Sequence, residues 1–139
     1  MNHWDTSLVG DFDPNNYVGF VYQATNKATG KSYIGRKNFK KLNRKPPLKS
    51  STSKRKRKII SESNWATYTT SSKTINYEIK HGAKFNFRII SLHKTKSALN
   101  YNEVKQMILH DVMTAKMADG ERAYYNLNIP AVRTVPYGD

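Results

Sequence analysis

The sequence predicts an α+β domain in which a three-stranded antiparallel sheet is flanked by helices, with elements in the order β-β-α-β-α. Two short apolar-aromatic runs joined by turn residues, a third alternating run, and two stretches with helical spacing support this prediction. At 139 residues the chain can form one core. We therefore expect a domain over residues 17–128, an N-terminal arm of low order at 1–16, and a C-terminal tail at 129–139.

The first two strands are expected at residues 17–25 and 31–37. One contains Gly19-Phe-Val-Tyr22, and the other contains Tyr33-Ile-Gly35. The intervening Thr25-Asn-Lys-Ala-Thr-Gly30 is rich in turn residues, so the pair is expected to form a β-hairpin. This hairpin would bring Tyr22 and Tyr33 close together.

The remaining elements follow from caps and periodicity. A short helix should begin at Ser71-Ser72, because a serine hydroxyl can accept a hydrogen bond from a free amide at a helix start, and it should end at Gly82. Alternation predicts a strand at 84–92. A longer helix is expected at about 99–117 and should stop at Gly120. Its core side would carry apolar residues at helical spacing, namely Val104, Met107, Ile108 and Ala115.

The composition is strongly basic, with a net charge of +14 and a pI of about 10.0. Nucleic acid is the expected partner of such a chain, whereas a ribosomal-type structural protein and a binder of anionic membranes are alternatives. No apolar run of about 18 residues occurs and no leader pattern is visible, so we expect a cytoplasmic protein that is neither secreted nor membrane-spanning. Because cysteine is absent, any metal would need oxygen or imidazole ligands.

The basic residues are concentrated in one segment. From Arg36 to Lys58 the sequence has no acidic residue, and half of the protein's lysines and arginines lie there. We expect residues 38–64 to form a loop that contacts phosphates, which makes binding strongly salt-dependent. A solvated charge run or a localisation signal is the alternative. The expected contacts are Lys37, Lys40, Lys41, Lys54, Arg55, Lys56, Arg57 and Lys58.

These motifs together resemble the GIY-YIG nuclease family. The second motif, Tyr33-Ile-Gly35, matches fully, whereas in the first Phe20 and Val21 stand between glycine and tyrosine. The resemblance extends over residues 17–128 and includes a serine-rich helix entry, a histidine-glycine exit, a helical glutamate and a Tyr-Asn pair. These features correspond to Ser71-Ser72-Lys73, His81-Gly82, Glu103 and Tyr125-Asn126. The spacing of Trp65, Tyr68 and the paired serines is similar to that of phage-encoded members.

The resemblance implies a Mg²⁺- or Mn²⁺-dependent DNA endonuclease, encoded by a bacteriophage or mobile element and acting on double-stranded DNA in the bacterial cytoplasm. By this resemblance Glu103 binds the metal, Asn126 supports the site, Tyr22 activates water and Tyr33 supports the water or the scissile phosphate. A lone carboxylate can hold one Mg²⁺ whose other positions are filled by water. A tyrosine can act on water if nearby cations lower its pKa.

The catalytic arginine has two candidates of equal weight. The family places it on a helix one to two turns after the second motif, which favours Arg44, but Asn43 and Pro46-Pro47 interrupt that pattern. Arg36 directly follows Tyr-Ile-Gly and would project from the strand end. The histidine that some members place before the paired serines is replaced by Thr70, which favours a tyrosine-based mechanism.

Further contacts and alternative functions also follow from the sequence. Ser71, Ser72 and Lys73 are expected to contact DNA, and Trp65 could either stack on bases or pack a loop. A monomer or weak homodimer is expected, so double-strand cleavage would require two nicks or a dimer. One alternative function is a non-catalytic nucleic-acid-binding protein that retains the fold. Another is a basic inhibitor that sequesters an acidic host protein.

Overall fold

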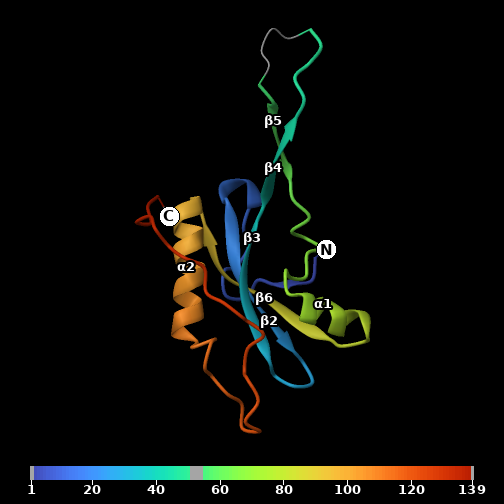
Figure 1. Ribbon diagram of the computed structural model, residues 1–139, viewed down its shortest axis with the longest axis vertical. Helices are drawn as coiled ribbons and strands as arrows, with labels where there is room; N and C mark the ends of the chain where they lie inside the picture. The colour runs from blue at the N-terminus through green and yellow to red at the C-terminus, as the bar shows by residue number, and fades with distance from the viewer. Residues whose placement is uncertain (1, 51–54, 139) are drawn as a thin grey trace.

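The computed structural model describes residues 2–50 and 55–138. The strands and helices in chain order are β1 (Trp4–Asp5), the 3-10 helix η1 (Pro14–Asn16), β2 (Gly19–Asn26), β3 (Ser32–Asn38), β4 (Lys40–Lys45), β5 (Arg57–Glu62), α1 (Lys73–Lys80), β6 (Phe85–His93) and α2 (Lys96–Leu109). The α+β class is confirmed, and β2, β3, α1, β6 and α2 follow the predicted order. In Figure 1, the two helices lie on opposite sides of the sheet.

The main sheet has four strands in the order β1-β6-β2-β3. Strand β2 lies inside the sheet and pairs antiparallel with both β3 and β6. Strand β3, which carries Tyr-Ile-Gly, pairs with β2 on one side and forms an edge of the sheet. The Tyr33-Ile-Gly35 motif therefore lies at a sheet edge, where one row of backbone groups is not used by a neighbouring strand.

Side-chain alternation on β2 separates two apolar clusters, because successive residues of a strand face opposite sides of the sheet. Phe20, Tyr22 and Ala24 belong to an aromatic cluster that also contains Ile75 of α1. Val21 belongs to a smaller cluster completed by Ile34, Leu99, Met107 and Val112. Burial of both faces explains why β2 reads as a nearly continuous apolar run.

The N-terminal segment is more ordered than the predicted arm at residues 1–16. Trp4 and Asp5 form β1, which runs parallel to β6 and adds a fourth strand to the sheet. The Trp4 side chain packs edge-on against Phe20 and Tyr22, and its indole Nε1 donates to the Trp65 main-chain oxygen at 2.7 Å. Two residues are too few to show the alternation of a strand, so β1 could not be predicted from this short, mostly polar segment.

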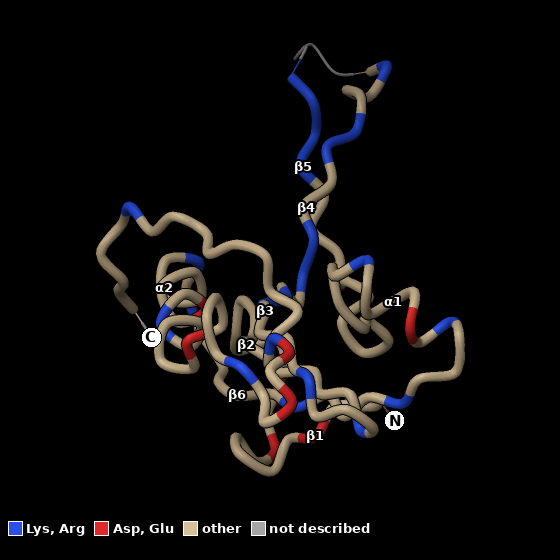
Figure 2. The backbone as a smooth tube through the Cα atoms, turned by 60° about the horizontal axis from the view of Figure 1, so that its bottom comes forward, with Lys and Arg blue, Asp and Glu red and all other residues tan. Residues whose placement is uncertain are grey.

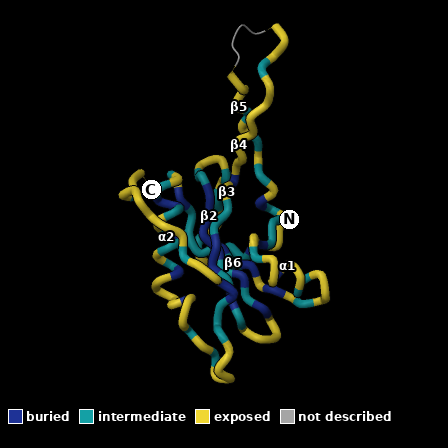
Figure 3. Tube along the Cα trace, viewed as in Figure 1, coloured by how far each residue is buried: buried dark blue, intermediate teal, exposed yellow. Residues whose placement is uncertain are grey.

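The segment at residues 38–64 is a second correction, because it contains a two-stranded antiparallel ribbon rather than only loop. Lys40 to Lys45 pair with Arg57 to Glu62 without a register shift. The ribbon projects from the body of the protein and is exposed along most of its length (Figures 1 and 3). Lysine and arginine are poor indicators of a strand, and the expected apolar alternation is largely missing.

Helix α2 starts earlier and ends earlier than predicted. Thr95 caps it by accepting a hydrogen bond from the Ala98 amide at 3.2 Å, and Asp111 adopts a positive φ of 51° just beyond its end. Its buried residues include Leu99, Glu103 and Met107, which are spaced four apart, whereas Ile108 is 63% exposed. The predicted core position of Met107 is therefore confirmed and that of Ile108 is wrong, Ala115 lies beyond the end of the helix, and the glutamate lies on the inner face.

We predict that Trp4→Ala strongly destabilises the fold, because it removes an indole that is only 6% exposed and contacts the aromatic cluster. The expected loss is about 3–5 kcal/mol of unfolding free energy, measured by urea denaturation. Leu8→Ala is the control, since Leu8 is 58% exposed and should change stability little. Equal, small effects of the two substitutions would contradict the packing role of Trp4.

Candidate active site

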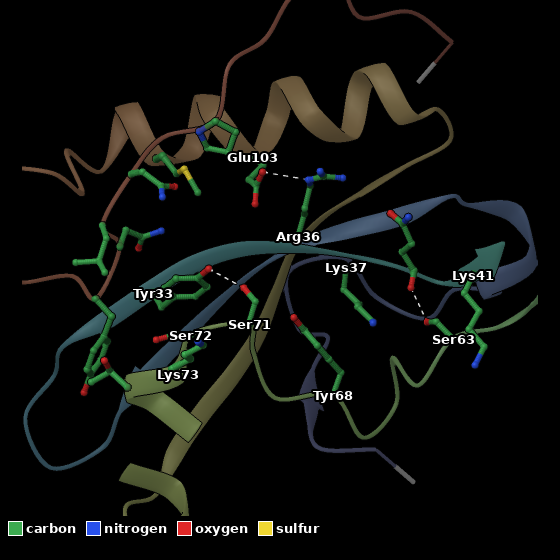
Figure 4. A pocket seen from close by; sticks show the side chains of 18 of the residues that line it. Tyr33, Arg36, Lys37, Lys41, Ser63, Tyr68, Ser71, Ser72, Lys73 and Glu103 are labelled. Carbon is green, nitrogen blue, oxygen red and sulfur yellow. Dashed lines mark hydrogen bonds and ion pairs between the residues drawn. The ribbon is translucent and has the colours of Figure 1, made fainter. Parts of the chain in front are cut away.

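A cleft with a volume of about 910 Å³ lies along the edge strand β3. Figure 4 shows its side chains converging from β3, the start of α1, α2 and the base of the ribbon. The residues that line it are Tyr33, Arg36, Lys37, Asn38, Lys40, Lys41, Leu42, Ser63, Tyr68, Ser71, Ser72, Lys73, Thr74, Glu103, Met107, Tyr125, Asn126, Leu127, Asn128 and Pro130.

The cleft extends around the sheet edge, so that both faces of β3 contribute to it. Tyr33 is paired with Ala24, on the side of α1, and its hydroxyl lies 3.0 Å from the Ser71 Oγ. Arg36 is paired with Val21, on the side of α2, and its Nε lies 3.2 Å from Glu103 Oε1. Residues three apart on a strand face opposite sides, and an edge strand allows both to reach one cavity.

The glutamate in this ion pair is the more buried partner. The Glu103 side chain is 8% exposed, compared with 35% for Arg36. Burial raises the pKa of Glu103 above its usual value, because a charged carboxylate loses hydration, and the attraction of Arg36 opposes this increase only in part. The pair therefore places a carboxylate and a guanidinium within direct reach of the cleft, with the carboxylate weakly hydrated.

The two tyrosines lie at different depths. Their ring centroids are 6.3 Å apart, so the predicted proximity is confirmed. Tyr22 is 1% exposed, does not line the cleft, and donates a hydrogen bond to Thr70 Oγ1 at 3.3 Å. Burial raises its pKa well above 10.0. Burial also raises the pKa of Tyr33, and the contact with Ser71 offsets this increase in part. Both phenols are consequently neutral near neutral pH.

Gly35 explains how the two rings can approach each other. It is paired with Tyr22 across the hairpin. A Cβ atom at this position would lie 2.7 Å from the Tyr22 hydroxyl oxygen and 2.9 Å from Tyr33 Cε2. Both distances are shorter than van der Waals contact, so the glycine of Tyr-Ile-Gly provides the space in which the rings pack.

The C-terminal segment covers part of the β3 edge. The Ser32 amide donates to the Ala123 oxygen at 2.9 Å, and the Tyr125 amide donates to the Ser32 oxygen at 2.7 Å. The side chain of Asn126 then accepts from the Ile34 amide at 3.0 Å and donates to the Ile34 oxygen at 2.8 Å. Asn126 is 2% exposed, and both ends of its amide group are engaged with β3. It therefore fixes the segment that borders the cleft.

The start of α1 forms the opposite border. The Ser72 hydroxyl accepts from the Ile75 amide at 3.3 Å, which confirms the predicted cap. The Ser72 amide in turn donates to Thr70 Oγ1 at 3.1 Å. Ser71, Ser72 and Lys73 all line the cleft. A helix N-terminus favours negative charge, and Lys73 adds a formal positive charge there.

Comparison with protein families decides the identity of the fold. Residues 4–129 match the family model described as "Putative endonuclease segE, GIY-YIG domain". The chain belongs to this GIY-YIG family. No curated protein and no solved structure matches the chain significantly. Family membership indicates an endonuclease-type hydrolase with a nucleic-acid substrate. Within the described residues, no helix is both long enough and apolar enough to cross a membrane.

The GIY-YIG motifs and the two candidate arginines can now be placed. Arg36 follows the second motif and contacts Glu103 in the cleft. Arg44 lies on β4, is exposed, and is not a lining residue. After the second motif, the described residues form the β4–β5 ribbon rather than the helix that the resemblance implied. The geometry therefore favours Arg36 over Arg44 as the arginine of the cleft.

Among the predicted DNA contacts, Lys37, Lys40, Lys41, Ser71, Ser72 and Lys73 line the cleft. Arg55, Lys56, Arg57 and Lys58 lie farther out, on or near β5, and Lys54 lies outside the described residues. Trp65 is 8% exposed and packs on Phe39 in the core. Base stacking by Trp65 was therefore the wrong alternative, because its indole is covered by the protein.

Tyr68 is the aromatic side chain that reaches the cleft instead. The Lys37 ammonium lies 4.2 Å from the centre of its ring, which is a cation–π contact. Partial burial, together with repulsion from Lys41, lowers the pKa of Lys37. The Trp-x-x-Tyr spacing was visible in the sequence, but it did not reveal which of the two aromatic residues faces outward. The Arg122 guanidinium donates to the main-chain oxygen of Asn126 at 2.6 Å, and no sequence pattern predicted this contact.

We predict that Gly35→Ala disrupts the packing of the two tyrosines, because the new methyl group would overlap both rings. The expected cost is about 1–3 kcal/mol, the usual range for overpacking, with a change in the near-ultraviolet tyrosine signal. The cost should be smaller in a Tyr33→Ser background, which removes one of the overlapping rings. An unchanged unfolding free energy in Gly35→Ala would contradict this explanation of the motif.

Proposed function

We propose that the protein is a Mg²⁺-dependent endonuclease that hydrolyses phosphodiester bonds in double-stranded DNA, one strand at a time. The observation that supports this proposal is the Arg36–Glu103 pair, which places a guanidinium that could bind phosphate 3.2 Å from a carboxylate that could bind a metal ion, in a basic cleft. We further propose a bacteriophage or mobile-element origin and action in the bacterial cytoplasm as a monomer or weak homodimer. The family membership and the net charge of +14 support this reading.

The donor set of the cleft is compatible with Mg²⁺ bound through one carboxylate. Glu103 is the only acidic side chain among the lining residues, and no cluster of three metal-ligating side chains is present in the described part of the chain. Mg²⁺ commonly uses one or two carboxylates together with water and substrate phosphate oxygens. Glu103 would hold the ion, which would supply charge neutralisation and a bound water with a lowered pKa.

The basic side chains of the cleft would bind the DNA backbone. Arg36 can donate two hydrogen bonds to non-bridging oxygens and stabilise the charge that develops during hydrolysis. A phosphate would compete with Glu103 for Arg36, which leaves the carboxylate available as a ligand. The start of α1, with Lys73, would receive a neighbouring phosphate.

The tyrosines would act as neutral phenols in this proposal. The Tyr33 hydroxyl, which contacts Ser71 at the cleft surface, would orient the attacking water or a phosphate oxygen by hydrogen bonding. Tyr22 would hold Tyr33 in place by ring packing and Thr70 by a hydrogen bond, from the core side of the cleft. Activation of water by Tyr22 stays a prediction, and the burial of its hydroxyl argues against it. Asn126 would act as a positioning residue, since its amide is engaged with Ile34.

The first prediction from this proposal is that the wild-type protein converts supercoiled plasmid to the nicked form with Mg²⁺ and stops when the metal is chelated. Glu103→Gln and Arg36→Ala should each lower the rate by at least about 100-fold, the usual effect of losing a charge-stabilising group. Gel analysis under single-turnover conditions would measure this. Binding of plasmid without nicking by the wild-type protein would contradict hydrolysis and support a non-catalytic binder.

Two controls separate chemistry from folding in this experiment. Arg133→Ala removes an exposed arginine outside the cleft and should leave the nicking rate unchanged. Because the pKa of Glu103 is raised on folding, its charged form is disfavoured in the folded protein, so Glu103→Gln should not lower the melting temperature. Arg44→Ala should retain more activity than Arg36→Ala at saturating enzyme, and the reverse order would assign the catalytic role to Arg44.

The second prediction concerns pH. The carboxylate form of Glu103 is required to bind a metal, and burial raises its pKa above the usual 4.5. As the pH falls through this raised pKa, Glu103 takes up a proton and nicking should decline, whereas activity should be retained above it. Nicking rates at constant ionic strength, saturating DNA and sub-saturating Mg²⁺ measure this limb, because bound Mg²⁺ would itself lower the pKa of the carboxylate. An acid limb at or below 4.5 would show that Glu103 titrates as an ordinary glutamate or is not required.

A further inference from the structure

The ribbon formed by β4 and β5, here called the β-arm, is the most basic projection of the protein. Six of its twelve residues are lysine or arginine, and Glu62 at its base is the only acidic one. Figure 2 shows basic residues along both strands, with most acidic residues in the body of the protein. An isolated two-stranded ribbon is at best marginally stable in water, so the exposed β-arm is suited to binding a partner.

The register divides the β-arm into two faces. Leu42 is paired with Ile60, and Arg44 is paired with Lys58, so these four side chains share one side, here called the Leu42 face. Asn43 is paired with Ile59, and Lys45 is paired with Arg57, on the opposite side, here called the Asn43 face. Each face thus carries one arginine and one lysine in a directly cross-strand pair.

The two faces differ in how far the protein itself covers them. On the Leu42 face, Leu42 is 52% exposed and Ile60 is 70% exposed, and they form a contiguous apolar pair between charged residues. On the Asn43 face, Ile59 is half-buried, and Arg57 Nε donates to the Pro46 oxygen at 3.1 Å. The Leu42 face therefore has the apolar surface and the arginine that remain available to a partner.

The base of the β-arm is attached firmly to the core. Phe39 precedes β4 and is fully buried, and Trp65 follows β5 and packs on it at 5.0 Å. The Ser63 amide donates to the Phe39 oxygen at 2.8 Å, and Trp65 Nε1 donates to Glu62 Oε1 at 2.9 Å. These contacts fix the direction in which the β-arm leaves the cleft, so a ligand bound to the arm is held in a defined position relative to Arg36.

We propose that the β-arm enters the major groove of the substrate duplex with its Leu42 face toward the base edges. This inference rests on the proposed DNA substrate. A two-stranded ribbon fits the major groove, which is about 12 Å wide. Arg44 would contact guanine, Leu42 and Ile60 would contact thymine methyl groups, and the remaining basic residues would contact phosphates. The cleft supplies the chemistry, and the β-arm supplies the preference for particular base pairs.

The length of the β-arm sets the expected distance between cleavage and recognition. Arg36 and Arg44 are eight residues apart on β3 and β4, which corresponds to at most about 27 Å of extended chain. This distance covers about eight base pairs of B-DNA at about 3.4 Å per base pair. Base contacts by the β-arm should therefore lie on one side of the nick and within that distance.

The test compares two matched double variants of the full chain. Arg44→Gln/Lys58→Gln changes the Leu42 face, and Lys45→Gln/Arg57→Gln changes the Asn43 face. Each removes one arginine and one lysine. Fluorescence anisotropy with a mixed-sequence duplex, without divalent metal, measures the affinity for DNA. The affinity should fall at least about tenfold in the first variant and about threefold in the second. Equal losses would indicate phosphate contacts alone and overturn the insertion of the Leu42 face.

Modified duplexes identify the groove. Replacing guanine by 7-deazaguanine removes a major-groove acceptor, and it should weaken binding by the wild-type protein but not by Arg44→Gln/Lys58→Gln. Replacing guanine by inosine removes a minor-groove amino group and should have little effect. Sensitivity to inosine alone would overturn the major-groove assignment.

The same variants separate this inference from the proposed hydrolysis. Nicking by the wild-type protein, combined with equal affinities of the two double variants, would overturn the role of the β-arm and leave the endonuclease function intact. Face-dependent binding by a protein that does not nick would support the β-arm and overturn the hydrolysis.

Discussion

The edge position of β3 is the constraint on which the rest of the structure depends. Side chains on one strand point to opposite faces of a sheet, and inside a sheet Tyr33 and Arg36 would be separated by their neighbours. Because β3 is an edge strand, a substrate can contact both faces around it. The same edge receives Glu103 from α2 and the start of α1, so two helices on opposite faces contribute to one cleft.

The sequence was most informative where motifs and pairing coincide. The hairpin followed from two aromatic runs separated by turn residues, and Ser72 and Gly82 marked the short helix correctly. Glu103 was assigned to the right helix, and the structure confirms that it shares a cleft with Tyr33. These features depend on local chemistry, such as caps, turns and alternation, and such chemistry can be read without long-range information.

Features that depend on distant contacts could not be predicted in the same way. Strand β1 exists because Trp4 packs against residues far along the chain, and two residues have no readable period. The β-arm consists mostly of residues with low strand propensity, and buried anchors at Phe39 and Trp65 hold it. The choice between Arg36 and Arg44 also required the folded structure, because it depends on which of the two side chains reaches Glu103.

Asn126 has a consequence for access to the cleft. With one amide group it forms the two hydrogen bonds that a neighbouring strand would give Ile34, without continuing along β3 as a strand would. Had the C-terminal segment continued as a fifth strand, its backbone would have paired with β3 beside Arg36 as well. The C-terminal segment thus covers the edge at Ser32 through its backbone and at Ile34 through the Asn126 side chain, and Arg36, two residues farther along β3, lines the cleft.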